Sequence, residues 1–232
     1  NLLTNPGFEN ASGGLADNWQ AIGDGWGNGI QSVQEAAYTG SYGISIQTAT
    51  SNNPWVSQIV PVEEDATYKF DSWFKTMSVS GNVGYKIEFY KGPEKTAEGL
   101  VRQFTYYAPA ETLDGQWHQI SYERLAPPGA KYVAFYLRLY GTGTVYFDDA
   151  SLMKTKDKPQ IVVNTNQVYY YPDLTEGKID VQLAPEDGIF TGKTVDFAIL
   201  DPSGHAIFIQ TGTSAAAALT ASFDPQTMEV QL

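Results

Sequence analysis

This chain contains a succession of short segments in which apolar and polar residues alternate, and this pattern limits the folds that it can adopt. A period of two places alternate side chains on the two faces of a β-strand, and turn-forming residues separate the segments at regular intervals. No segment sustains the period of about 3.6 residues that marks an amphipathic helix. The pattern predicts an all-β sandwich for the first part of the chain. Besides a short first strand at the N-terminus, the expected strands span residues 30–36, 42–49, 55–62, 67–76, 83–90, 101–107, 117–124, 131–140 and 144–152.

A second domain is predicted after the first, because 232 residues exceed the usual size of one domain. We expect a first domain at 1–154, a charged linker at 155–159 that ends in proline, and an immunoglobulin-like β-sandwich at 160–232. About six strands are visible in the second domain, where such a sandwich has about seven. The sequence also stops within an apparent strand, so we expect an N-terminal fragment of a longer protein. The strands expected there span residues 161–171, 177–183, 193–200, 205–210, 217–223 and 227–232.

Two adjacent carboxylates, Asp148 and Asp149, interrupt the apolar alternation in the last strand of the first domain. The chain opens with a short apolar segment, a Pro-Gly turn and Glu9. Because the first and last strands of a sandwich are commonly neighbours, we expect Glu9 to lie near one of the two aspartates. Carboxylates brought together either raise a pKa or share a cation, and oxygen ligands suit calcium (Ca²⁺). The sequence predicts a calcium site here; a hydrogen-bonded surface pair is the alternative.

Catalysis is not indicated by any motif in the chain. Asp148 and Asp149 are adjacent on a strand and would point to opposite faces, so they cannot form a catalytic pair unless a bulge intervenes. His118 and His205 fall in different predicted domains, and neither joins a recognisable nucleophile or zinc motif. We therefore predict a non-catalytic protein.

Alternation along residues 131–140 separates a core face from an aromatic outer face. The predicted core face carries Val133, Phe135, Leu137 and Leu139. The opposite face carries Tyr132, Ala134, Tyr136, Arg138 and Tyr140. Sugar rings stack on aromatic side chains, and a few polar groups fix the orientation of the ligand. The pattern predicts a carbohydrate-binding face, and a contact between domains is the alternative, because exposed aromatic patches mark interfaces of any kind.

Neighbouring strands are expected to extend this face in a jelly-roll order. The strand at 83–90 would turn Lys86, Glu88 and Tyr90 outward. The strands at 55–62 and 101–107 would contribute further residues, although alternation does not fix their register. These would be Trp55, Gln58 and either Tyr106 or Tyr107. The predicted carbohydrate-binding residues are Trp55, Gln58, Glu88, Tyr106, Tyr136, Arg138 and Tyr140.

The sequence contains four tryptophans besides Trp55. Trp19 and Trp117 are predicted to pack in the core or against loops, because large aromatic side chains mostly serve packing. Trp73 is expected on the sheet opposite the binding face. Trp26, in the glycine-rich stretch at 23–29, has packing and ligand contact as equal alternatives.

The charge of the chain limits its partners. A net charge of −12 with only 14 basic residues argues against nucleic acid and against anionic membrane surfaces. The same charge favours a neutral polysaccharide, such as a β-glucan, xylan or mannan, unless Arg138 and Lys86 compensate locally. Abundant tyrosine and tryptophan with scarce lysine favour a bacterial protein that is secreted or held at the cell surface.

Several motifs follow one another along the first domain. They are residues 1–9 (NLLTNPGFE), 38–43 (YTGSYG), Gln58 ahead of 67–70 (TYKF), 115–117 (GQW) and 145–152 (VYFDDASL). In this order they resemble the carbohydrate-binding modules of the family 4/9/22 type over about residues 1–154.

The resemblance implies a galactose-binding-like jelly roll with a structural calcium ion and a cleft for one polysaccharide chain. By this likeness Glu9 and either Asp148 or Asp149 would ligate the ion, together with backbone oxygens of the 39–41 loop, which includes Ser41. It also implies a module that holds an appended glycoside hydrolase or lyase near its polysaccharide. Because relatives of this shape also serve as linkers, a structural or adhesive pair of sandwiches that contacts protein is the alternative.

Overall fold

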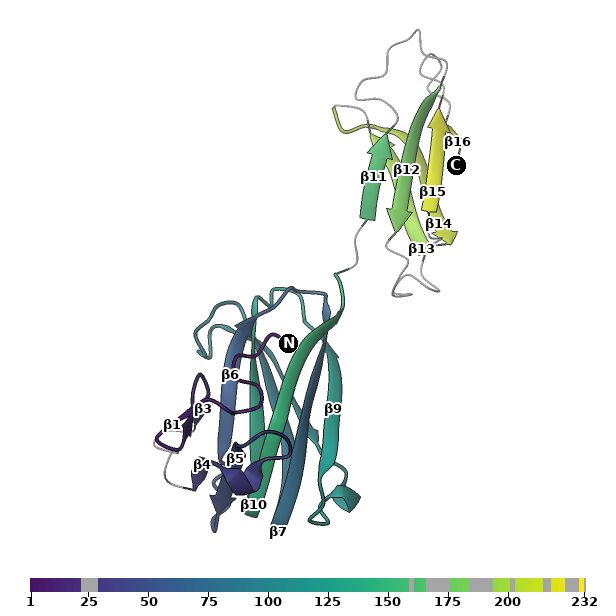
Figure 1. Ribbon diagram of the computed structural model, residues 1–232. Helices are drawn as coiled ribbons and strands as arrows, with labels where there is room; N and C mark the ends of the chain where they lie inside the picture. The colour runs from purple at the N-terminus through teal and green to yellow at the C-terminus, as the bar shows by residue number, and fades with distance from the viewer. Residues whose placement is uncertain are drawn as a thin grey trace. The chain divides into compact units, whose positions relative to one another are not determined.

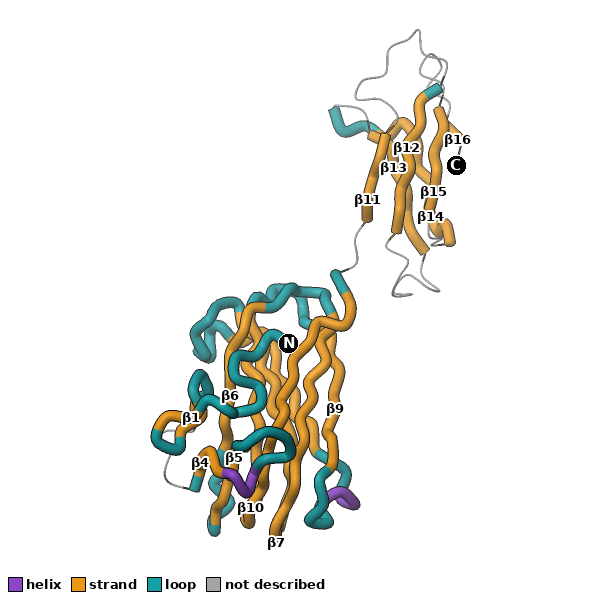
Figure 2. Tube along the Cα trace, viewed as in Figure 1, coloured by secondary structure: helices purple, strands orange, loops and turns teal. Residues whose placement is uncertain are grey.

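The chain is almost entirely β-structure. The computed structural model describes residues 1–21, 29–158, 161–165, 176–183, 194–200, 203–214, 218–223 and 230–231. The chain divides into two compact units, Asn1–Lys158 and Pro159–Leu232. Strands make up most of the described residues of both units, with two short 3-10 turns in the first (Figure 2). In this described part, no helix is long and apolar enough to cross a membrane. The predicted all-β class is confirmed.

The first unit begins with short strands and continues with much longer ones (Figure 1). Its last strand ends at Lys156, so the unit includes most of the segment 155–159 that was expected to be a linker. Its elements are β1 (Ala11–Ser12), β2 (Leu15–Ala16), β3 (Gln20–Ala21), β4 (Ile30–Val33), the 3-10 turn η1 (Gln34–Ala36), β5 (Gly43–Thr48), β6 (Trp55–Pro61), β7 (Thr67–Tyr90), β8 (Leu100–Tyr107), the 3-10 turn η2 (Ala110–Thr112), β9 (His118–Leu125) and β10 (Tyr132–Lys156).

Strands β7 and β10 are far longer than the sequence predicts. Alternation predicts a break in each of them, near residues 77–82 and 141–143, and that prediction is wrong. Gly81 pairs with Gly141 at this point, and both have positive φ angles, 124° and 148°. A Cβ atom on Gly81 would lie 2.1 Å from the carbonyl oxygen of Tyr140. Glycine therefore lets the two strands bend together at a corner without ending their pairing.

The two long strands belong to both layers of a sandwich. In the first layer, the first half of β10 pairs with β6 and with the second half of β7, which pairs in turn with β8. In the second layer, the second half of β10 pairs with β5 and with the first half of β7, which pairs with β9. All of these pairings are antiparallel. The result is the predicted jelly-roll sandwich, in which two strands cross from one layer to the other.

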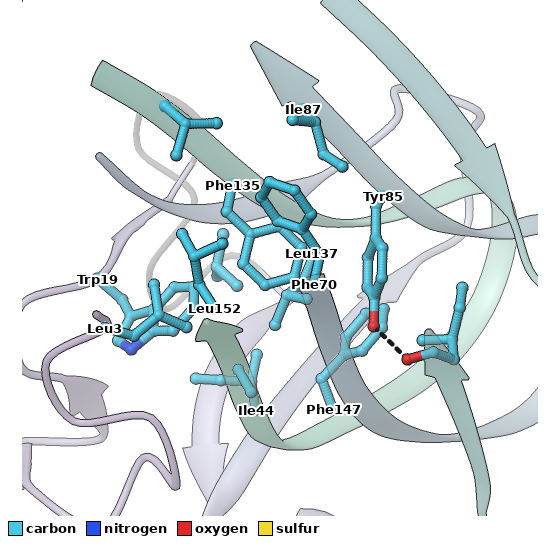
Figure 3. Packing of buried hydrophobic residues seen from close by; sticks show 14 of the residues in the cluster. Leu3, Trp19, Ile44, Phe70, Tyr85, Ile87, Phe135, Leu137, Phe147 and Leu152 are labelled. Carbon is cyan, nitrogen blue, oxygen red and sulfur yellow. Dashed lines mark hydrogen bonds between the residues drawn. The ribbon is translucent and has the colours of Figure 1, made fainter. Parts of the chain in front are cut away.

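Large apolar side chains fill the space between the layers (Figure 3). The ring of Phe135 lies 5.2 Å from that of Phe70 and 4.8 Å from that of Tyr85. Tyr85 is fully buried, and its hydroxyl donates to the carbonyl oxygen of Ile120 at 2.9 Å, so its polar atom is satisfied. Burial of each such side chain contributes about 1.5–3 kcal/mol. The predicted core face of β10 is confirmed, since no part of its four members is exposed: Val133, Phe135, Leu137 and Leu139.

The first nine residues lie beside the end of β10, as expected. The backbone N–H of Leu2 donates to the carbonyl oxygen of Leu152 at 2.8 Å. These residues do not form the predicted strand, however, because Asn5 and Phe8 take positive φ angles of 52° and 57°, which interrupt an extended backbone. The opening and closing segments of the first unit are therefore neighbours, joined by a turn-rich chain.

The second unit contains β11 (Ile161–Thr165), β12 (Gly177–Leu183), β13 (Thr194–Leu200), β14 (Ala206–Ser214), β15 (Ala218–Phe223) and β16 (Val230–Gln231). Strands β11, β12, β15 and β16 form one sheet in that order, and β13 pairs with β14. These strands overlap the predicted ones; the predicted positions 166–171, 193, 217, 227–229 and 232 lie outside the described residues. The immunoglobulin-like fold of this unit stays a prediction.

Candidate functional site

A β-bulge in β10 turns its two adjacent carboxylates toward one loop. Asp148 pairs with Trp73, and the next pair is Ser151 with Asp71, so three steps along β10 match two along β7. Asp149 takes a positive φ of 48° within this bulge. The bulge interrupts the alternation that would send Asp148 and Asp149 to opposite faces of the sheet.

Asp148 is the buried support of the loop at 38–42. Its side chain is fully buried. One carboxylate oxygen accepts hydrogen bonds from the backbone N–H groups of Tyr38 at 2.7 Å and Thr39 at 3.0 Å, and the other accepts one from Asp149 at 2.7 Å. Burial raises the pKa of Asp148 to about 6, because it disfavours the charged form, although the three N–H groups oppose the shift.

Asp149 and Glu9 hold the same loop. Asp149 accepts a hydrogen bond from the hydroxyl of Thr39 at 2.9 Å. Glu9 accepts one from the backbone N–H of Ser41 at 2.9 Å. Between them, Gly40 has a φ of 65°, and a Cβ atom there would lie 2.1 Å from a carboxylate oxygen of Glu9. Glu9 reaches the loop because residue 40 has no side chain.

The oxygen atoms of these three carboxylates are of the kind that binds calcium. Among the ion pairs of the described residues, none joins a basic side chain to Glu9, Asp148 or Asp149. Over the same residues, no three acidic or histidine side chains converge closely enough to hold a metal ion. Backbone oxygens of the loop, including that of Ser41, would therefore have to complete a calcium site.

Most of the predicted carbohydrate-binding residues lie on the outer face of the first layer, which we call the aromatic face. Trp55 lies opposite Arg138, and Lys86 lies opposite Tyr136. Residues directly opposite each other in antiparallel strands share a face of the sheet. By this register the aromatic face includes Trp55, Ser57, Lys86, Glu88, Tyr90, Tyr107, Tyr136, Arg138 and Tyr140.

The rings of the aromatic face differ in their accessibility. Trp55 packs edge-on against Tyr136 at 5.1 Å, and Tyr136 is only 6% exposed. Tyr107 is 47% exposed and packs edge-on against Tyr140 at 4.9 Å. The guanidinium carbon of Arg138 lies 4.8 Å from the ring centre of Tyr140. Tyr136 therefore supports the face, while Trp55, Tyr107 and Tyr140 offer accessible rings.

Glu88 lies in a polar network on this face. Its side chain is buried, forms an ion pair with Lys86 and accepts a hydrogen bond from the hydroxyl of Tyr90 at 2.7 Å. Burial alone would raise the pKa of Glu88, but hydrogen bonds from Lys86, Tyr136 and Tyr90 hold it below its usual value. The carboxylate is thus charged near neutral pH, and its oxygen atoms are already engaged by Lys86 and Tyr90.

Gln58 does not lie on the aromatic face, and that prediction is wrong. It pairs with the core residue Phe135, so its side chain lies on the inner face of the layer. Its amide donates to the carbonyl oxygen of Thr4 at 2.7 Å and accepts from the N–H of Thr4 at 2.8 Å. Spacing already opposes the prediction, because Trp55 and Gln58 are three apart and cannot share one face of a regular strand.

Tyr106 also faces inward, which corrects a second prediction. It pairs with the buried Tyr85, and its ring stacks on that of Tyr122 at 4.3 Å. Tyr107, the other residue considered, takes the place on the aromatic face, opposite Gly84. The two tyrosines are adjacent, so a shift of register by one residue exchanges their roles.

Lys95 is a part of the aromatic face that the sequence analysis misses. It lies in the loop between β7 and β8, and its ammonium lies 5.4 Å from the ring centre of Trp55 and 5.3 Å from that of Tyr136. It donates a hydrogen bond to the hydroxyl of Ser57 at 3.0 Å. Burial lowers the pKa of Lys95, because its charged form loses contact with water. Periodicity contains no signal for a loop side chain that folds onto a sheet.

Trp19 packs as predicted. It is 5% exposed, and its ring lies 4.9 Å from that of Phe8. Its indole N–H donates to the carbonyl oxygen of Asn5 at 3.0 Å, so the side chain fixes the turn-rich opening segment. Trp26 lies outside the described residues.

Trp73 and Trp117 lie beside Tyr38 of the loop 38–42. Trp73 alternates with buried residues of β7 and so lies on the outer face of the second layer, as predicted. The ring of Tyr38 stacks on that of Trp73 at 4.1 Å and lies 5.3 Å from that of Trp117. The prediction that Trp117 packs against a loop is confirmed.

Comparisons with known proteins give one family and a shared fold. The sequence model of a family described as "Carbohydrate binding domain" matches residues 1–143. No curated protein matches the sequence. A domain of tailspike protein 4 from bacteriophage CBA120 is 15% identical with a TM-score of 0.50, over 66% of this chain and 21% of that one. A "Family 16 Carbohydrate Binding Module-2" is 20% identical with a TM-score of 0.47, over 66% and 100%. A xylan-binding domain from Paenibacillus barcinonensis Xyn10C is 17% identical with a TM-score of 0.46, over 65% and 92%.

Proposed function

The chain belongs to the carbohydrate-binding domain family whose sequence model matches residues 1–143, and from this premise we propose that its aromatic face binds a polysaccharide chain. The family is defined by binding and not by catalysis, so the first unit recognises a glycan without altering it. We expect the ligand to lie across β6, β10, β7 and β8, the strands that form the first layer.

One observation carries the proposal. Three accessible aromatic rings, those of Trp55, Tyr107 and Tyr140, share one face with a guanidinium group, that of Arg138. Sugar rings have apolar C–H faces surrounded by hydroxyl groups, so they need flat rings to stack on and a few polar groups that fix their orientation. The aromatic face supplies both.

Trp55→Ala tests this proposal. We expect it to weaken binding about tenfold, which corresponds to about 1.4 kcal/mol, because the stacking surface is lost. Trp117→Ala is the matched control, since it truncates a half-buried tryptophan on the other side of the unit and should leave binding unchanged. Retardation of both variants in gels that contain soluble glucan, xylan, mannan or an acidic polysaccharide measures the effect.

Circular dichroism of both variants confirms that they stay folded. If the two substitutions weaken binding equally, or if neither does so on a polysaccharide that retards the wild type, the glycan does not lie on the aromatic face. A wild type that no polysaccharide retards would contradict the proposed function itself.

A structural calcium ion at the loop 38–42 is a second part of the proposal. The support is that Glu9, Asp148 and Asp149 all hold this loop and that the described ion pairs give none of them a basic partner. Carboxylate and backbone oxygens are the ligands that calcium prefers. Glu9, Asp149 and the backbone oxygens of the loop would hold the ion, with the buried Asp148 fixing the loop around it.

The setting of this function is also a proposal. Polysaccharide chains are too large to enter a cell intact, so a domain that binds them acts where the polymer is, outside the cell or on its surface. We propose that the module keeps an appended glycoside hydrolase or lyase close to its polymer. Holding enzyme and substrate together raises their effective concentration without any new contact at the catalytic site.

A further inference from the structure

The aromatic face includes three basic side chains and one acidic one, although the chain as a whole is strongly negative. The chain carries a net charge of −12. The strands contribute Lys86, Glu88 and Arg138 to this face. The loop between β7 and β8 carries Lys91, Glu94, Lys95 and Glu98, and of these Lys95 lies over the rings of the face. Lys86 and Glu88 form an ion pair, so their charges cancel. Lys95 and Arg138 remain, and within the described part of the chain neither forms an ion pair with a carboxylate.

Lys95 holds its charge in a partly buried position. Its ammonium lies over the rings of Trp55 and Tyr136 and donates to the hydroxyl of Ser57 at 3.0 Å. Glu88 acts on this charge electrostatically, but the oxygens of Glu88 are engaged by its own neighbours. An ammonium has three donors, and a partly desolvated cation gains more from an incoming anion than an exposed one does.

Arg138 is the second cation on this face. It lies directly opposite Trp55 in the register of β10 and β6. Its Nε–H donates to the carbonyl oxygen of Asn53 at 3.2 Å, and its plane lies near the ring of Tyr140. These contacts fix the guanidinium group, which can pair with a carboxylate through two parallel hydrogen bonds.

Resting on the proposed glycan-binding function, we propose that the aromatic face selects a polysaccharide that contains uronic acid residues. Lys95 and Arg138 bind the carboxylate, and Trp55, which lies next to both cations, stacks on the sugar ring. The preference for neutral glycans expected from net charge does not apply here, because two cations on the binding face form no ion pair with a carboxylate of the described residues.

Matched ligands test this inference on the full chain. Glucuronoxylan, polygalacturonate and alginate would each be compared with the same polymer after chemical reduction of its carboxyl groups, which removes the charge and keeps the backbone. We expect at least one acidic polymer to bind about tenfold more tightly than its reduced form. This advantage should shrink as the ionic strength rises, because salt screens the attraction between the charged polymer and the two cations.

Variants assign the effect to the two cations. Lys95→Gln and Arg138→Gln should each weaken binding of the acidic polymer much more than binding of its reduced form, so that most of the advantage of the acidic polymer is lost. Lys95→Arg should retain it. Lys75→Gln is the control, because it removes one positive charge from the second layer, where Lys75 pairs with Tyr146 of β10.

The outcomes separate this inference from the function on which it rests. Equal binding of acidic and reduced polymers, or binding of neutral glycans alone, would overturn the preference for uronic acids and leave carbohydrate binding intact. If Lys95→Gln weakened binding of the acidic polymer and of its reduced form equally, the preference for uronic acids would also be overturned. If no polysaccharide binds, both the inference and the proposed function are wrong.

Discussion

Gly40 has no side chain, and this allows Glu9, near the start of the chain, to contact the loop 38–42. The glycine has a φ of 65°, a conformation that other residues adopt at a cost. It also leaves space for the carboxylate of Glu9, which accepts hydrogen bonds from Ser41 and Tyr42. Glu9, which lies 31 positions before Gly40, thereby reaches this loop and accepts hydrogen bonds from two of its backbone N–H groups.

Gly40→Ala separates these two roles when it is compared with Gly13→Ala. Both glycines have a φ of 65°, but a Cβ atom on Gly13 would meet nothing within 4 Å. Gly13→Ala should cost about 1–2 kcal/mol of unfolding free energy from backbone strain alone. Gly40→Ala should cost about 1.5–3 kcal/mol more, because it also displaces a charged hydrogen-bond partner. Urea denaturation measures both values, and equal losses would show that the contact with Glu9 adds no stability.

The loop 38–42 is the element that joins the N-terminal segment to the bulge of β10. Glu9 holds it from one side, and Asp148 and Asp149 hold it from the other. Tyr38 then stacks on Trp73 of β7, so the loop is also packed against the second layer. A cation shared by these carboxylates would fasten the opening and closing segments of the unit at a single point.

Removal of calcium tests this arrangement. A ligand that binds only the folded state adds about 2.7 kcal/mol when its concentration is about 100 times its Kd. A chelator should therefore lower the melting temperature of the calcium-loaded protein. Glu9→Gln and Asp149→Asn should abolish this sensitivity, because they keep the shape of the side chains and remove their charge. Glu111→Gln, at an exposed carboxylate in η2, should respond to the chelator as the wild type does. A wild type with no response would contradict the proposed site.

Sequence alternation predicts a residue's face on its own strand but not the alignment of that strand with its neighbours. It places Phe135 in the core and Tyr140 on the outer face, because both lie in one long regular run. It fails for Gln58 and Tyr106, since their faces follow from pairing with β10 and β7. It does not find Lys95, whose place is set by a loop.

At the scale of the whole molecule, the interior of the first unit is complete within residues 1–158. Phe147 and Leu152 are fully buried and lie in the last part of β10. Beyond them β10 stays paired with β7, and exposed ion pairs join Lys154 to Glu63 and Lys158 to Glu64. Such surface pairs contribute about 0–1 kcal/mol each, so the stability of the unit depends on the buried part of β10.

Two truncations test whether the first unit is independent. A chain that ends after Lys158 should fold and melt in one cooperative transition, because its core is retained. A chain that ends after Thr144 should not fold, because it loses Phe147, Leu152 and the bulge that supports the loop 38–42. Near-ultraviolet circular dichroism and thermal scans distinguish the two, and an unfolded 1–158 chain would show that the first unit depends on the second.

The route of β10 has a mechanical consequence. The chain leaves the first unit at the end of this strand, so tension applied through residues beyond Lys158 enters β10 first. Its antiparallel hydrogen bonds to β7 run perpendicular to the strand along nearly its whole length, and a pull along β10 loads them in shear, all at once. Because these hydrogen bonds carry the load at the same time, they must break together before β10 separates from β7. A module that binds a polymer while its tether is pulled would therefore transmit the force through β10, the longest of the described strands.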